Sequence, residues 1–227
     1  MPADRLPSEP GPANEAGAVH ATPVPHDRSA DRNLSRGAPD VLVETVRRLE
    51  GSGGLDRPGE VVAAMADAVV RSDRARDLLT GTWLGHALHP LLTDFPLGMW
   101  ASASLLDLVG GRSARPAARR LVGLGVVAAL PTAASGLAEW READRPSQRV
   151  GTVHAATNSA ALALYSASYL HRRRGRHGRA VMLGITGGLV ATAGGYLGGH
   201  LTLARKTGTR DPAFVRPATD GGVPVDQ

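Results

Sequence analysis

The chain has 227 residues, of which 42% are hydrophobic and 21% charged, with a formal net charge of +5 and no cysteine. The lack of cysteine excludes disulfides, cysteine-ligated iron–sulfur clusters and haem attached through thioether bonds. The basic residues, nearly all arginine, stand in short runs between apolar segments with few aromatic residues among them, which argues against nucleic-acid binding. The apolar residues are mainly Ala, Leu, Val and Gly, and such small residues suit helices packed in lipid.

The first 80 residues are more polar than the middle of the chain. Residues 1–38 are rich in Pro, Gly, Ser, Asp and Arg, so we expect a disordered tail, and the start of the chain lacks the apolar run of a cleavable signal peptide. Residues 39–80 carry apolar side chains at helical spacing, which predicts short amphipathic helices over 39–50 and 59–79. The second is too charged to span a bilayer, and we expect it to lie on the membrane surface or pack on the bundle.

Four apolar segments come next in the chain, over about 86–110, 117–139, 150–170 and 180–203. Each is close to the roughly 20 residues that a helix needs to cross a hydrocarbon core. Because the connections are short, the sequence predicts an all-α integral membrane protein, an up-down four-helix bundle over residues 81–205. We expect a multi-pass protein of the cell membrane, with a disordered C-terminal tail over 206–227.

The orientation in the membrane is indicated by the arginines. The loop between the first two spans and the loop between the last two are dense in arginine, and the positive-inside rule predicts that both are cytoplasmic. Arginines also stand on the other side, and this orientation requires the long N-terminal tail to cross the membrane.

Polar side chains in lipid are functional candidates because they are costly to bury there. His86 and His89 begin the first span, His154 begins the third, and His200 ends the antiparallel fourth, so an up-down bundle brings all four to one membrane face. Glu139, at the end of the second span, reaches the same face. Two further residues lie slightly deeper: Asp94, and Asn158, which shares a helix face with His154.

Three interpretations of these residues remain open. The first is a b-type haem with His89 and His154 as axial ligands and His86 and His200 as further ligands or propionate partners. The second is a transition-metal ion bound by histidines and a carboxylate, drawn from His86, His89, His154, His200 and Glu139. The third is a membrane scaffold in which these residues only cap and pair. Because the sequence has no hydrolase signature, we expect a binding or electron-transfer module rather than an enzyme.

Four segments of the chain resemble the bacterial membrane family called domain of unknown function 2231. They are Gly81–Gly98, Ala134–Trp140, His154–Asn158 and Gly194–Leu201, and the resemblance covers about residues 80–205, with Ala87 where the family usually has proline. The family has no established activity. Some members look fused to a Rieske iron–sulfur domain, which implies electron transfer, and since this chain lacks cysteine the resemblance implies a separate redox partner.

Overall fold

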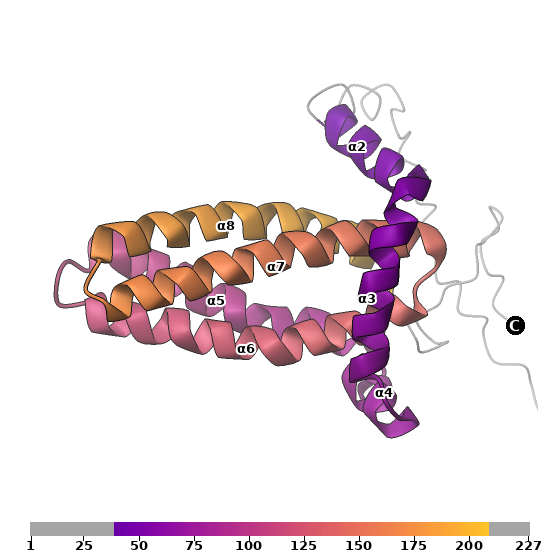
Figure 1. Ribbon diagram of the computed structural model, residues 1–227, viewed down its shortest axis with the longest axis horizontal. Coiled ribbons are helices and arrows are strands. Elements are labelled where there is room, and N and C mark those ends of the chain that lie inside the picture. Colours follow the sequence, from indigo (N-terminus) through magenta and orange to yellow (C-terminus); the bar gives the residue numbers. More distant parts are fainter. Residues whose placement is uncertain (1–38, 209–227) are drawn as a thin grey trace, which may run out of the picture. The chain divides into compact units, whose positions relative to one another are not determined.

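The computed structural model describes residues 39–208, and every regular element in this range is a helix (Figure 1). The predicted tails, 1–38 and nearly all of 206–227, lie outside the described residues. Short helical elements come first, after which four long helices make up the rest. The short elements and their bounds are α2 (Pro39–Gly51), the 3-10 turn η1 (Gly53–Leu55), α3 (Asp56–Val69), α4 (Asp73–Thr80) and the 3-10 turn η2 (Thr82–Leu84). The long helices are α5 (Leu88–Val109), α6 (Arg115–Glu142), α7 (Arg145–Arg173) and α8 (His177–Gly199), which runs on into a π-helical turn, η3 (His200–Ala204).

The predicted amphipathic stretch 59–79 is two helices rather than one. The α3 helix ends at Val69, and α4 begins at Asp73 after a break. Ser72 causes the new start, because its backbone is extended and its hydroxyl accepts a hydrogen bond from the Ala75 N–H at 3.2 Å, as an N-cap does.

The four apolar segments are all helical, as predicted, and α6 and α7 extend beyond the predicted ends. In α7 the extra turns start where Asp144 caps the helix by accepting from the Ser147 N–H, with Pro146 in the first turn. The α5–α6 and α7–α8 turns each contain a glycine in the left-handed region, Gly111 with φ +61° and Gly175 with φ +71°. The long helices therefore run in alternating directions.

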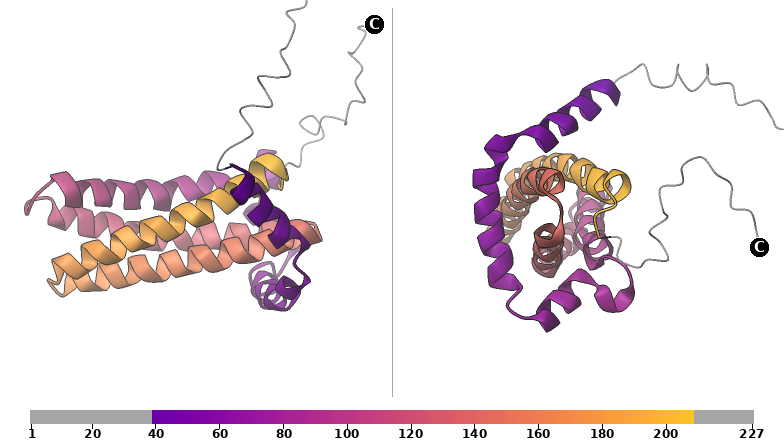
Figure 2. Two further views of the ribbon diagram at one scale, coloured as in Figure 1. Left: turned by 90° about the horizontal axis from the view of Figure 1, so that it is seen from above. Right: turned by 90° about the vertical axis from the view of Figure 1, so that its right-hand side faces the viewer.

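The long helices pack as two hairpins placed side by side (Figure 2). α5 packs on α6 and α7 on α8, and the hairpins meet along α6–α7 and α5–α8. The centre is filled by one stacked aromatic pair, Trp100 on Tyr165, with ring centres 4.0 Å apart, surrounded by small residues such as Ala103, Ala118 and Ala129.

A proline in α5 is matched by a hydroxyl from its neighbour. Pro96 has no N–H, so the Leu92 carbonyl lacks its usual helical donor. The hydroxyl of Thr132 in α6 lies 3.1 Å from that carbonyl oxygen, within reach to donate to it. The same hydroxyl lies 2.9 Å from the Ala128 carbonyl oxygen of its own helix, so the two carbonyls share its single proton. Sharing lowers the cost of a backbone group that has no helical donor in an apolar environment.

Only part of the predicted membrane topology is supported by length and hydropathy. Among the described helices, two are long and apolar enough to cross a membrane, Arg115–Glu142 and His177–Ala204. Within the most apolar 18-residue stretch of each helix, only 28% and 33% of the residues are buried inside the protein. The core helix of a soluble protein would be mostly buried. The α5 and α7 helices do not meet this criterion because they carry the polar residues of the candidate site.

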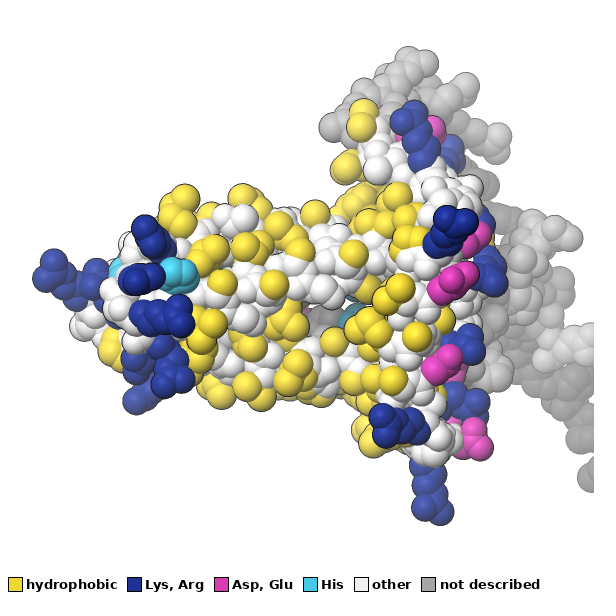
Figure 3. All heavy atoms as spheres, in the orientation of Figure 1, with side chains coloured by type: hydrophobic (Ala, Val, Ile, Leu, Met, Phe, Trp, Pro, Cys, Tyr) yellow, Lys and Arg dark blue, Asp and Glu magenta, His cyan; other side chains and the backbone are white. Residues whose placement is uncertain are grey.

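The surface of the long helices is apolar in its middle and charged at its ends. Figure 3 shows hydrophobic side chains over the sides of the helices, arginines gathered at the α5–α6 and α7–α8 turns, and a mixture of arginines and acids at the opposite end. The exposed side chains along these helices include Leu105, Leu108, Val127, Leu130 and Leu189. An apolar band of this kind marks a surface that contacts lipid or another protein.

Candidate functional site

His89 stands in the first turn of α5 and reaches across to α6. Its Nδ1 lies 2.9 Å from the Thr132 carbonyl oxygen. Because a carbonyl only accepts, Nδ1 carries the proton and Nε2 keeps a free lone pair. The ring lies against Gly136, where a Cβ would come within 2.8 Å of His89 Cε1, so a side chain at position 136 would displace the imidazole.

His154 in α7 has a matching environment on α8. Its Nδ1 lies 2.8 Å from the Gly194 carbonyl oxygen, so this nitrogen is also the donor. The ring lies against Gly198, where a Cβ would be 2.9 Å from His154 Cε1. Asn158, one turn on, donates to the His154 carbonyl at 2.9 Å, and its Nδ2 is also 3.2 Å from His154 Nε2.

The two imidazoles meet in the interior. Their ring centres are 6.0 Å apart and their planes are nearly perpendicular, at 84°. Two imidazoles bound to opposite sides of one metal ion, at metal–nitrogen distances of about 2 Å, have ring centres roughly 6 Å apart. An edge-to-face contact between two rings has a similar separation. The separation of 6.0 Å is therefore shared by both arrangements.

His200 does not join this pair through any contact that the structure defines. Its Nε2 lies 2.9 Å from Glu50 Oε1, at the end of α2. Arg205 approaches the same carboxylate at 3.7 Å and also pairs with Asp144. His200 therefore ties the end of α8 to α2, and Arg205 ties the same end to the start of α7.

The remaining predicted residues are spread over this end of the helices. His86 and Asp94 are exposed, the first in the turn before α5 and the second on the outer side of α5. Glu139 is buried, 8% exposed, and the chain at Gly208 folds against it, since a Cβ there would be 2.8 Å from Glu139 Oε2. Within residues 39–208 no three His, Asp or Glu side chains are grouped so that they could hold a metal ion. The predicted cluster of four histidines is thus reduced to the pair His89 and His154.

A second polar pair lies at the opposite end of the same two helices. Arg172 of α7 holds Asp107 of α5 in a two-point ion pair, with Nη1 2.9 Å from Oδ1 and Nη2 on Oδ2, and both side chains are 4% exposed. This ion pair was not predicted from the sequence. Arg172 was missed because the residues around it suggested a solvated loop.

The pairs form three levels between α5 and α7. His89 faces His154, Trp100 stacks on Tyr165, and Asp107 binds Arg172, and in each pair the second residue follows the first by 65 residues. The glycines and backbone carbonyls that contact these side chains also occur in equivalent pairs. In α6 and α8, at an offset of 62 residues, the repeated positions are Gly125 and Gly187, Thr132 and Gly194, and Gly136 and Gly198. The two hairpins are therefore structural repeats, a feature that the sequence pattern did not predict.

The chain belongs to the family DUF2231, described as a predicted membrane protein, whose model matches residues 85–211. The match covers the four long helices and begins after α4. No curated protein and no solved structure is detectably similar to the chain. The resemblance seen in the sequence is confirmed, and the description of the family agrees with the predicted membrane character.

Proposed function

We propose that all four long helices cross the membrane and that the turns α5–α6 and α7–α8 face the cytoplasm. The charge distribution supports this topology, because these turns are dense in arginine and Asp107, near the end of α5, is paired with Arg172. The helix lengths also support it. His154 and Arg172 are 18 residues apart along α7, about 27 Å at 1.5 Å per residue, which is close to the thickness of a hydrocarbon core.

Cysteine accessibility tests this topology, since the natural chain has no cysteine. Ser113→Cys places a thiol in the α5–α6 turn, and Ala143→Cys places one between α6 and α7. A membrane-impermeant maleimide is expected to label Ala143→Cys in intact cells and Ser113→Cys only after lysis. Labelling of both positions from the same side would contradict four spans.

We further propose that His89 and His154 are the axial ligands of one b-type haem. The observation that carries this proposal is the pair of imidazoles from two parallel helices, each with Nδ1 held by a backbone carbonyl. Such an Nδ1 hydrogen bond orients a ligand histidine and leaves Nε2 for the metal. The repeat of the two hairpins adds support, because it provides two equivalent ligands to a single group bound between them.

The number of ligands favours haem over a bare metal ion. A structural or catalytic zinc site takes three or four protein ligands, whereas a haem iron takes four nitrogens from its porphyrin and needs only two from the protein. Two histidines are what the described residues bring together here. Without cysteine a haem would be held noncovalently, as haem b.

Bound haem with two histidine ligands would supply one-electron transfer. The residues of this chain would hold and orient the two imidazoles. Thr132 and Gly194 do so through their carbonyls, and Gly136 and Gly198 leave room for the rings. Binding at His154 Nε2 would require the Asn158 amide, 3.2 Å from that nitrogen, to move. The proposed role is an electron carrier or redox sensor of the membrane, with a redox partner supplied by another protein.

Haem content tests the proposal. The protein is produced with haem precursor, purified in detergent and assayed for haem per chain. The wild type is expected to carry one haem, and His89→Ala and His154→Ala each to lose most of it. His86→Ala and His200→Ala are matched controls that keep it. A haem-free wild type containing stoichiometric zinc, iron or copper would instead favour the metal-ion interpretation.

A further inference from the structure

The helix α3 lies across the end of the long helices where the histidine pair is located (Figures 1 and 2). Its buried residues Gly59, Val62 and Ala66 form the side that packs on α6 and α7. Arg149 of α7 fastens its first turn by donating to both carboxylate oxygens of Asp56, at 2.9 and 3.1 Å. This segment precedes the part of the chain that the family model matches.

The rest of α3 is divided into an apolar side and a charged side. Val61 and Met65, four residues apart and so on one face, are 64% and 52% exposed. The acidic residues Glu60 and Asp67 are exposed on the other side, since Asp67 comes two residues after Met65, about 200° around the helix. The side packed on the long helices lies between these two sides.

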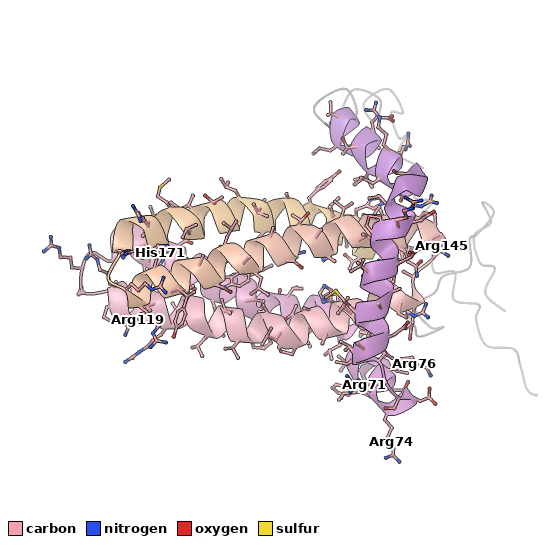
Figure 4. The ribbon with its side chains drawn as sticks, viewed as in Figure 1. Arg71, Arg74, Arg76, Arg119, Arg145 and His171 are labelled. Carbon is pink, nitrogen blue, oxygen red and sulfur yellow. The ribbon has the colours of Figure 1, made fainter. Side chains whose placement is uncertain are left out.

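The two sides of α3 point in opposite directions along the long helices. Figure 3 shows yellow side chains on the side of α3 that is continuous with the apolar band of the long helices, and charged side chains on the side turned away from it. Figure 4 shows Arg71, Arg74 and Arg76 near α4, with Arg145 at the same end. Trp83, 64% exposed in η2, adds a residue typical of membrane interfaces.

We propose that α3 lies in the interfacial plane of the bilayer, with Val61 and Met65 in contact with lipid acyl chains and its acidic side in water. Helices with this segregation and orientation bury their apolar face at the headgroup boundary. The inference rests on the proposed spanning of the bundle, because only then does the apolar band define the direction of the bilayer. It also sets the depth of the histidine pair, which would lie just inside this boundary.

The charges on and around α3 predict which lipid headgroups α3 requires for contact with the bilayer. Acidic and basic side chains alternate here, with Asp56 on Arg149, Asp67 on Arg141 and Glu142 near Arg76. Attraction to anionic headgroups is therefore largely cancelled, in contrast to the arginine-rich turns at the other end. Contact of α3 with lipid is expected in vesicles of purely zwitterionic phosphatidylcholine.

Spin labels at single cysteines test the proposal in the full chain reconstituted in such vesicles. Val61→Cys and Met65→Cys probe the apolar side, Glu60→Cys is the matched control on the charged side, and Val127→Cys, in the middle of α6, reports on the spanning helices. Collisions with oxygen, which concentrates in lipid, are compared with collisions with a water-soluble nickel chelate. The oxygen-to-nickel ratio is expected to be several-fold higher at positions 61, 65 and 127 than at 60.

Each other outcome overturns a defined part of the account. If position 127 contacts lipid but 61 and 65 are as open to nickel as 60, α3 is not in the interface, while the spanning helices stand. If 61 and 65 are shielded from both reagents, another protein surface or a second copy covers them, and the lipid proposal is wrong. If 127 is also open to nickel, the proposed spanning fails first.

Discussion

Arg172 comes 65 residues after Asp107 and binds its carboxylate at two points, and His154 faces His89 at the same offset. Along α7 the two pairs are about 27 Å apart. The helices that fail the hydropathy criterion for membrane spans are thus the ones that carry both polar pairs. Since the members of these two pairs have their partners within the protein, α5 and α7 keep these four groups inside.

The ion pair is expected to matter for stability through its burial. Asp107→Asn leaves the Arg172 guanidinium without its counter-ion, and loss of one member of a buried pair costs about 3 to 5 kcal/mol. The double variant Asp107→Leu with Arg172→Leu is expected to lose less, because no charge is left unmatched. Thermal unfolding in detergent compares them, and a double variant less stable than the single one would contradict this explanation.

The glycines behind the histidines are expected to control the site. Gly136→Ala and Gly198→Ala place a Cβ within 3 Å of His89 and His154, so the imidazoles must move. Both substitutions are expected to lower the haem retained after purification. Gly199→Ala is the matched control, because a Cβ at position 199 meets nothing within 4 Å. Equal haem content in all three variants would mean that the rings do not hold the cofactor in the observed positions.

Carbon monoxide binding gives a second test of whether both histidines bind the haem iron. With both histidines on the iron, the reduced wild type is expected not to bind carbon monoxide. In His89→Ala, any haem that remains has a free axial position, so carbon monoxide is expected to shift its Soret band. A wild type that binds carbon monoxide would rule out two histidine ligands.

Attachment of α3 is expected to depend on pH through Asp56. The hydrogen bonds from Arg149 hold the pKa of this carboxyl below its usual value. A lowered pKa stabilises the attached state above the ordinary carboxyl range, and the contribution is lost as pH falls through the lowered value. Mobility of a spin label at position 65 should rise on acidification below about pH 4, and the Asp56→Asn variant should already be mobile at pH 7. A label whose mobility is unchanged in Asp56→Asn would show that the apolar contacts of α3 suffice.

The helices and the histidine pair could be predicted from the sequence because they depend on local patterns. Apolar runs of span length indicated the four long helices, and their alternating direction brought His89 and His154 to one end. The partner of His200 could not be predicted, because Glu50 is 150 residues away on a helix whose direction depends on packing. The hairpin repeat was missed because the shared residues, such as Gly125 with Gly187 and Ala118 with Ala180, are common ones set among many differences.

The most direct test of the central claim is the absorption spectrum of the purified protein, oxidised and then reduced with dithionite. If His89 and His154 hold a haem, a Soret band is present and reduction sharpens the α and β bands. These bands are then lost in both His89→Ala and His154→Ala. A colourless protein after haem supplementation, or bands unchanged in both variants, would contradict the account.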